Sequence, residues 1–248
     1  MVRPIGVLAA IPQEQAALVG IMTGVSTGDG FTVGSIDGTP LCVGLTGIGK
    51  VNAAVTATQL CERFDPGVIV FTGVAGGLDP ELEIGDVVIG TSIIQHDAGV
   101  LGDDGLDTYQ AGHIPFFNPT DRLGYRPSDR LVAAVRRELG PPPFSLGNGG
   151  RIVLGTILTG DQFLASDRQR ELLHSRFTAR AIEMEGGAVA QVADRYNIDH
   201  LAIRTLSDLA GSESSEAFTE FLDLVAHQTV EVFRRLLPTF AAASSNRN

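Results

Sequence analysis

Acidic side chains stand at the ends of several apolar runs of the sequence. Glu14 lies just after the first such run, Glu183 and Glu185 end a later one, and Asp208 ends another. Each of them alone could be a helix cap or a solvated carboxylate, because acids are common in first helical turns. If the runs are parallel strands, however, these carboxylates converge on one crevice and form a candidate acid/base constellation.

This candidate site has several carboxylates, and the sequence shows neither the spacing of metal ligands nor basic residues that would hold an anion. Such a site suits a neutral polyhydroxylated substrate whose transition state is cationic. Cleavage of an N-glycosidic bond is a reaction of this kind, because C1′ of the ribose becomes oxocarbenium-like while a proton must reach the departing base. One protonated carboxyl can act as the general acid, one carboxylate can take a proton from water, and another can accept hydrogen bonds from the ribose hydroxyls. Crowding of like charges is expected to raise at least one of their pKa values toward neutrality.

Two glycine-rich segments accompany these carboxylates. The first, GLTGIGKV (44–51), matches the phosphate-binding pattern GxxxxGK[ST] except for Val51, which cannot supply the hydroxyl ligand for magnesium. A dinucleotide-binding fingerprint also fails, because Asn52 stands where the third glycine is needed. The second segment, GVAGGL (73–78), is predicted to be a turn with a close backbone approach. Both follow predicted strands, so we expect them to line the same crevice, with Gly76 in its wall.

Short apolar runs alternate along the chain with longer segments of helical periodicity, which indicates an α/β sheet with helices on its faces. The predicted strands span 5–10, 41–45, 68–71, 86–94, 152–158, 181–184 and 200–206. The predicted helices start at Pro12 and span 51–64, 129–139, 166–177, 186–196 and 216–237, the last ending at Pro238. The face of the helix over 51–64 is predicted to consist of Val51, Ala54, Val55, Thr58 and Cys61.

The segment 97–127 is rich in Gly, Asp, Pro and Asn and carries an apolar patch at 114–117. A stretch of this length without regular structure is usually a functional lid or a partner-facing segment, and the patch fits either a buried lid or a dimer contact. We interpret His96 and Asp97 as the start of this loop rather than as a proton relay.

Composition limits the possible partners of the chain. Its 248 residues include 18 Lys+Arg and 29 Asp+Glu, a formal charge of −11 that argues against binding to nucleic acid or to an anionic membrane surface. The hydrophobic content of 44% predicts a full core, which we expect to form one domain over 1–248. Cys42 and Cys61 fit neither a zinc site nor a disulfide framework, which favours a reducing, cytoplasmic location. We expect no secretory signal, no membrane helix, no metal and no cofactor, and the terminal SSNRN is predicted to fray.

Several segments together carry a family pattern: IGVLAAIPQE (5–14), TGIGKVNAA (46–54), VFTGVAGGLDPELEIGDVVI (70–89), TGDQFL (159–164), AIEMEGGAVA (181–190) and IRTLSDLAG (203–211). In this order and spacing they resemble the 5′-methylthioadenosine/S-adenosylhomocysteine nucleosidases of the nucleoside phosphorylase superfamily. The likeness covers nearly the whole chain. It implies a three-layer α/β/α sandwich with a central mixed, twisted sheet, a homodimer, and release of adenine from a 5′-thio-substituted adenosine by hydrolysis.

The resemblance also implies roles for residues on the leaving-group and water sides of the reaction. Asp208 looks like the acid that protonates N7 of adenine, and Ser207 like the residue that helps to orient it. Glu14 is similarly placed to the residue that activates the attacking water, and Arg204 to one that helps hold this water. Val74 departs from the pattern, because many relatives have a small hydroxyl residue near the water.

Further residues match the groups that hold the substrate. Glu185 matches the acceptor for the ribose hydroxyls, with Met184 packing under the sugar and Glu183 beside it. The base side is implied to consist of Phe163, as the adenine stacking partner, and the backbone at Leu164. The apolar pocket for the 5′-thio substituent is implied to be walled by Ile48, by Phe218 and, from the other subunit of the homodimer, by Pro115.

Alternatives stay open at this point. Phosphorolysis occurs in the same superfamily, but it needs cationic groups near C1′, and neither AAIPQEQ nor the strand that ends in VFT contains an arginine. A nucleoside-binding module without catalysis would be expected to lack Glu14 or Asp208, and both are present. The substrate stays undecided between methylthioadenosine, adenosylhomocysteine, 5′-deoxyadenosine and aminodeoxyfutalosine. The physiological role stays open between methionine salvage, clearance of a methylation by-product and supply of quorum-signal precursors.

Overall fold

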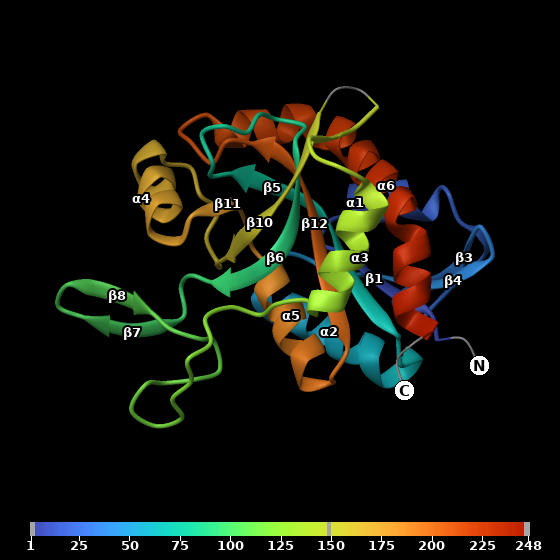
Figure 1. Ribbon diagram of the computed structural model, residues 1–248, viewed down its shortest axis with the longest axis horizontal. Coiled ribbons are helices and arrows are strands. Elements are labelled where there is room, and N and C mark those ends of the chain that lie inside the picture. Colours follow the sequence, from blue (N-terminus) through green and yellow to red (C-terminus); the bar gives the residue numbers. More distant parts are fainter. Residues whose placement is uncertain (1–2, 148–149, 246–248) are drawn as a thin grey trace.

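A ten-stranded sheet forms the centre of the fold. Nine of its strands lie side by side in the order β11-β10-β6-β12-β5-β1-β4-β3-β2, and β9 pairs with β10. The computed structural model describes residues 3–147 and 150–245 (Figure 1). The strands are β1 (Ile5–Ala9), β2 (Thr23–Gly28), β3 (Phe31–Ile36), β4 (Thr39–Leu45), β5 (Val68–Gly77), β6 (Val87–Gln95), β9 (Phe144–Ser145), β10 (Arg151–Thr159), β11 (Ala179–Glu183) and β12 (Asp199–Asp208). The helices are α1 (Pro12–Val19), α2 (Lys50–Phe64), α3 (Asp129–Leu139), α4 (Asp167–Phe177), α5 (Gly186–Arg195) and α6 (Ser214–Ser245).

Alternate residues of the central strands point to opposite faces, and each face packs against its own helices. Ile5 and Val7 join Leu18 of α1, Val135 of α3 and Phe233 of α6 in one apolar cluster. On the other face, residues of the same strands pack against α2 and α5. Figure 1 shows α1, α3 and α6 gathered on one side. The predicted three-layer α/β/α sandwich is thus confirmed. The sheet is mixed, because β1 runs parallel to β4 and β5, and β12 runs parallel to β5, while β11 runs antiparallel to β5, β12 to β6 and β3 to β4.

Parallel pairing brings Glu14 and Asp208 to one edge of the sheet. Glu183 and Glu185 reach the same edge from β11, which runs antiparallel to β5, so the expectation of parallel strands is wrong for this strand. β1 lies between β4 and β5, and β12 lies beside β5, so the carboxyl ends of these strands meet. β5 continues through the glycine-rich segment to Gly77 instead of ending at Phe71 in a turn, which corrects the prediction. At the end of β12 the register shifts between Leu206 and Asp208, and this bulge places two consecutive side chains, Ser207 and Asp208, beside the site.

Three further features differ from the sequence-based prediction, and a fourth prediction lies outside the described residues. The hairpin β2–β3 was not expected, because its strand β2 is short, exposed and rich in Thr, Ser and Gly and so carries no apolar signal. Within 97–127 a two-stranded hairpin forms from β7 (Gly99–Gly102) and β8 (Gly105–Thr108), which projects from the body of the fold (Figure 1). The long helix α6 continues past Pro238 to Ser245, where the Ser244 hydroxyl donates to the carbonyl of Arg3 at 2.7 Å. The terminal SSNRN reaches beyond the described residues, which end at Ser245.

The buried face of α2 shares only Cys61 with the predicted one. Ala53, Ala57, Leu60 and Cys61 are buried, whereas Val51 is 76% exposed. Small residues face inward because α2 packs against α5, whose own inner face is rich in glycine and alanine. No helix in the described part of the chain is both long and apolar enough to cross a membrane.

Because of His200 on β12, we expect the free energy of unfolding of the protein to fall at acidic pH. The side chain is buried, its Nε2 has no hydrogen-bond partner in the described structure, and burial lowers its pKa from 6.5 to about 4. Because the folded-state pKa lies below the unfolded one, the stabilisation from neutral His200 is present above pH 6.5 and is lost as the pH falls toward 4. We expect this group to remove about 3 kcal/mol from the free energy of unfolding over that interval.

Chemical denaturation at pH 6.5 and at pH 4 measures this contribution. In His200→Gln, which does not titrate, the free energy of unfolding should fall less over the interval than in the unaltered chain. His113→Gln, a change of an exposed histidine, is the matched control and should behave like the unaltered chain. An equal fall in His200→Gln and His113→Gln would contradict the assignment.

Candidate active site

A cavity of about 170 Å³ opens at the edge where the strands end. It is lined by thirteen of the fourteen residues that the sequence singled out, namely Glu14, Ile48, Val74, Gly76, Phe163, Leu164, Glu183, Met184, Glu185, Arg204, Ser207, Asp208 and Phe218. The exception is Pro115, which is exposed and does not line the cavity of its own chain. The lining residues that the sequence analysis did not name are Ala10, Ile11, Ala75, Gln162 and Ile182. All of these adjoin or lie within the quoted motifs, so proximity along the chain was the available signal.

Glu14 sits in the first turn of α1 with its carboxylate turned back onto the strand ends. It accepts backbone hydrogen bonds from Ala10 (2.8 Å), Ile11 (3.1 Å) and, across the site, Val74 (2.9 Å). Burial raises its pKa, while the charge of Arg204 and the three amide donors oppose that rise. Glu14 is therefore a buried, firmly oriented carboxylate with an elevated affinity for a proton, as a general base requires.

Glycines of β5 make room for these groups. Gly73 has a φ of 151°, and a Cβ atom there would lie 2.5 Å from Oε1 of Glu14 and 2.6 Å from a terminal nitrogen of Arg204. A Cβ atom at Gly76 would lie 2.9 Å from Oδ1 of Asp208. The predicted close backbone approach is therefore present, although the segment is a strand, and any side chain at Gly73 would displace the acidic groups.

Asp208 lies next to Gly76 of β5, whereas Glu14 lies next to Gly73. Its Oδ1 accepts the amide of Ala210 at 2.8 Å, and its Oδ2 accepts the Ser207 hydroxyl at 3.0 Å. Burial raises the pKa of Asp208, opposed by these hydrogen bonds and by the Ser214 hydroxyl. A carboxyl with a raised pKa can hold a proton for transfer, and Ser207 fixes its orientation.

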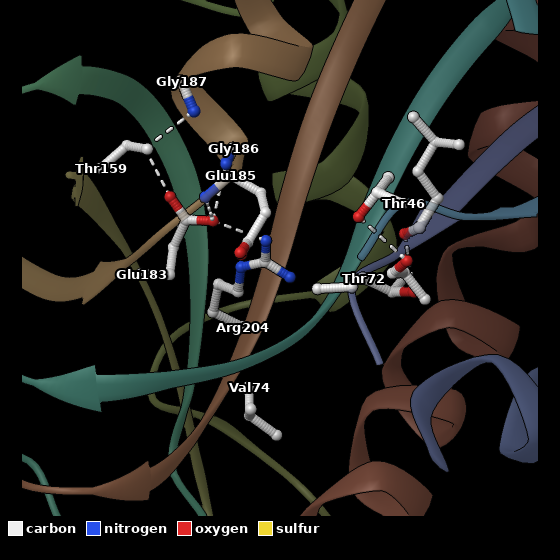
Figure 2. A network of polar contacts seen from close by, with 12 residues as sticks. Thr46, Thr72, Val74, Thr159, Glu183, Glu185, Gly186, Gly187 and Arg204 are labelled. Carbon is white, nitrogen blue, oxygen red and sulfur yellow. Dashed lines mark hydrogen bonds and ion pairs between the residues drawn. The ribbon is translucent and has the colours of Figure 1, made fainter. Parts of the chain in front are cut away.

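Glu183 is held differently from the other carboxylates, as Figure 2 shows. Its Oε2 accepts the amides of Gly186 (2.7 Å) and Glu185 (3.1 Å) and a guanidinium hydrogen of Arg204 (2.7 Å), while the Thr159 hydroxyl donates to Oε1. These donors hold the Glu183 carboxylate in one orientation in the lining of the cavity. Thr159, fully buried and outside the cavity lining, was not anticipated, since an isolated threonine at a strand end carries no distinctive signal.

Arg204 is 1% exposed and is therefore a buried cation that needs compensation. Besides its ion pair with Glu183, its guanidinium lies over the ring of Phe71 at 3.7 Å from the centroid. Phe71 was not anticipated as a partner either, because its position on β5 identifies it only as a core residue.

Glu185 stands between Glu183 and the glycine-rich turn before α2. Its Oε1 accepts the amide of Gly49 at 2.7 Å. Burial and, next, the charge of Glu183 raise its pKa to about 7, while the Gly49 amide and the charge of Arg204 oppose the rise. In Figure 2 the Glu185 carboxylate points toward the Arg204 guanidinium. A carboxylate in this environment is suited to accept hydrogen bonds from hydroxyl groups of a ligand.

Aromatic and aliphatic side chains form the outer part of the cavity. The rings of Phe163 and Phe218 meet edge to face, with centroids 6.0 Å apart and an interplanar angle of 85°. Ile48 is 58% exposed at the mouth, and Met184 lines the wall beside the glutamates. The cavity therefore combines an acidic, hydrogen-bonded floor with an apolar, aromatic entrance.

Comparison with known proteins identifies the family. The model of the phosphorylase superfamily matches residues 4–238. A 5′-methylthioadenosine/S-adenosylhomocysteine nucleosidase of Mycobacterium bovis is 46% identical, over 98% of this chain and 100% of that protein. The chain belongs to this nucleosidase family within the phosphorylase superfamily. The resemblance inferred from the motifs is thus confirmed.

Solved structures of nucleosidases show the same fold. A crystal structure of the 5′-methylthioadenosine/S-adenosylhomocysteine nucleosidase from Colwellia psychrerythraea, in complex with adenine, superposes with a TM-score of 0.83 at 31% identity, over 97% of this chain and 96% of that one. The futalosine hydrolase of Helicobacter pylori has a TM-score of 0.82 at 26% identity, over 96% of this chain and 98% of that one. A 5′-methylthioadenosine/S-adenosylhomocysteine nucleosidase and a futalosine hydrolase therefore share this fold.

Proposed function

We propose that the chain hydrolyses the N-glycosidic bond of 5′-methylthioadenosine and S-adenosylhomocysteine, releasing adenine and the 5-thio-substituted ribose. The observation that carries this proposal is the meeting of Glu14, Glu185 and Asp208 in one cavity, each buried and each with a raised pKa. Three carboxylates with different hydrogen-bond partners can divide the acid, base and sugar-binding tasks among them.

In the proposed mechanism, Asp208 gives its proton to N7 of adenine as the bond between C1′ and the base breaks. Glu14 takes a proton from the water whose oxygen forms the new bond to C1′, with Arg204 helping to hold this water. The negative charge of the carboxylates stabilises the cationic sugar in the transition state. One proton leaves Asp208 and one reaches Glu14, so the catalytic pair must exchange a proton with solvent before the next turnover.

The remaining lining residues hold the substrate in this proposal. Glu185 accepts the ribose hydroxyls, and Met184 packs under the sugar. Phe163 stacks on adenine, and the backbone at Leu164 reads the edge of the base. The 5′ substituent then lies at the apolar entrance, between Ile48 and Phe218.

The charge distribution supports water rather than phosphate as the nucleophile. Among the described residues that line the cavity, Arg204 is the one cationic side chain, and it is paired with Glu183 at 2.7 Å. A phosphate dianion at C1′ would face Glu14 with no free cation to compensate it, and burying such a charge unpaired is strongly unfavourable.

Adenine release from 5′-methylthioadenosine in phosphate-free buffer tests the proposal. We expect multiple turnovers, and addition of millimolar phosphate should leave the rate unchanged and yield no sugar phosphate. Turnover only in the presence of phosphate would instead establish a phosphorylase, and tight substrate binding with no product would establish a binding module.

The chain is further proposed to act as a single-domain cytoplasmic enzyme of methionine salvage and as a homodimer. Phe116 and Phe117, next to Pro115, are each 82% exposed, and large exposed apolar side chains are typical of interaction surfaces. Val51 and Val55 form a second exposed apolar strip, on α2 beside the cavity mouth at Ile48. In a homodimer, burial of these side chains would bring Pro115 of the partner subunit to the 5′ end of the site.

A further inference from the structure

A cluster of charged residues beside the cavity has no part in the proposed mechanism. We define the Lys50 cluster as Lys50, Asp97 and Asp161. The Lys50 ammonium lies 2.7 Å from Oδ1 of Asp97 and 3.6 Å from Oδ2 of Asp161. The other Asp97 oxygen accepts the amide of Asp161 at 3.0 Å, and Oδ1 of Asp161 accepts the amide of Lys50 at 2.9 Å. These contacts close a ring in which each residue is bound to the other two.

The environment of this ring makes it stronger than an ordinary surface ion pair. The side chains of Lys50 and Asp97 are only 18% and 15% exposed, whereas that of Asp161 is 48% exposed, so the Lys50–Asp97 pair is the more protected part of the ring. Burial alone would raise the pKa of Asp97, but the Lys50 ammonium and the Asp161 amide more than offset this and lower it, so the aspartate is ionised. Paired, partly buried charges are screened less by solvent than exposed ones, and a two-sided ring restrains each side chain further.

The ring ties the start of α2 to the ends of the paired strands β6 and β10. Lys50 opens α2, Asp97 follows β6, and Asp161 follows β10. None of the three lines the cavity. Immediately after Asp161, however, come Gln162, Phe163 and Leu164, which do line it.

The residue before Lys50 connects the ring to the floor of the site. Gly49 donates its amide to Glu185 at 2.7 Å, and this is the one hydrogen bond that the Glu185 carboxylate accepts within the described part of the chain. Gly49 has a φ of 93°, which glycine tolerates, and a Cβ atom there would lie 3.3 Å from Oδ1 of Asp161. The direction of the Gly49 amide thus depends on how the ring holds the start of α2.

We propose that the Lys50 cluster is a positioning element of the nucleosidase: by fixing the Gly49 amide, it holds Glu185 where the ribose hydroxyls bind. This inference rests on the proposed function, since it assigns the ring to the sugar-binding step of that reaction. Lys50, in a sequence that is close to a phosphate-binding motif, is thereby assigned to an internal ion-pair ring rather than to a ligand.

A double-mutant cycle tests the route from Lys50 to Glu185. Lys50→Met and Asp97→Asn are each made in the unaltered chain and in Glu185→Ala, and kcat/KM for 5′-methylthioadenosine is measured, with long incubations for the slow variants. We expect each change to lower kcat/KM about tenfold in the unaltered chain, equivalent to about 1.4 kcal/mol, and less than twofold in Glu185→Ala. Lys50→Arg, which keeps the charge, should recover most of the loss.

Arg151→Met is the matched control. It removes another ion pair of the same sheet, in which Arg151 lies 2.6 Å from Asp86 at the opposite end of β10, and it should leave kcat/KM within twofold. The inference would be overturned if the cluster variants lost the same factor in kcat/KM in the unaltered chain and in Glu185→Ala, or lost none in either. If Lys50→Met does not fold, Asp97→Asn alone decides between these outcomes. No adenine release by the unaltered chain would overturn the proposed function instead.

Discussion

Replacement of Asp208 by asparagine is expected to lower kcat by about 100- to 10,000-fold, the range that general acids contribute. The amide has nearly the size of the carboxyl and its oxygen can still accept the Ala210 amide, so the fold should persist. It has no acidic proton to give to N7, so the adenine would have to leave as an anion. Measurement of kcat at saturating 5′-methylthioadenosine, with circular dichroism as a check of folding, gives the result.

The control for this change is Asp86→Asn. Asp86 is also a buried aspartate in a network, paired with Arg151 at 2.6 Å, but it lies away from the cavity. We expect Asp86→Asn to lower thermal stability while kcat stays within a few-fold of the unaltered value. Near-normal kcat in Asp208→Asn would remove Asp208 from the acid role.

Replacement of Glu14 by glutamine is expected to have the second large effect, a loss of at least 100-fold in kcat. The glutamine oxygen can accept backbone amides as the carboxylate does, but its NH2 group would face the Val74 amide or those of Ala10 and Ile11, and it cannot take a proton from water. Because the base acts on water, single-turnover measurements should show the loss in the chemical step, with substrate affinity changed far less.

The pH dependence of kcat provides an independent check of Glu14. Burial raises its pKa above the ordinary 4.5, and the base must be ionised, so activity should fall as the pH decreases through this raised pKa. In Glu14→Gln the residual activity should lose that dependence. A Glu14→Gln profile with the same acid limb would assign the limb to another group, such as Glu185.

The edge of the sheet that carries the site could be predicted from the sequence because its signals are local. An apolar run followed by an acidic residue or by glycines identifies a strand end, and parallel strands place such ends together. This is why Glu14 and Asp208 could be expected in one crevice. Glu185 also lies in the cavity, but it follows β11, which runs antiparallel to β5, so the premise of parallel strands was wrong for it. The family motifs added the residues of the aromatic entrance, which carry no chemistry of their own to reveal them.

What could not be predicted depends on contacts between distant residues. Helical periodicity on α2 favoured the larger Val51 and Val55 as the buried face, but close packing against α5 selects Ala53 and Ala57. Thr159 and Phe71 support Glu183 and Arg204 from other strands, and nothing in their own neighbourhood in the sequence indicates this. Pro238 indicated a helix end, yet packing of Phe240 and the Ser244 hydroxyl keeps α6 helical beyond it.

The glycine-rich part of β5 has a consequence for which substrates can react. Val74 holds Glu14 through its amide, and Gly76, two residues along, abuts Asp208, so an extended backbone spanning about 7 Å separates the two supports. Neither support is a side chain that can change rotamer, so the backbone of β5 fixes the separation of the points that hold Glu14 and Asp208. Evolution toward other nucleosides should therefore alter the entrance first, while the reach from water to base stays constant across the lineage.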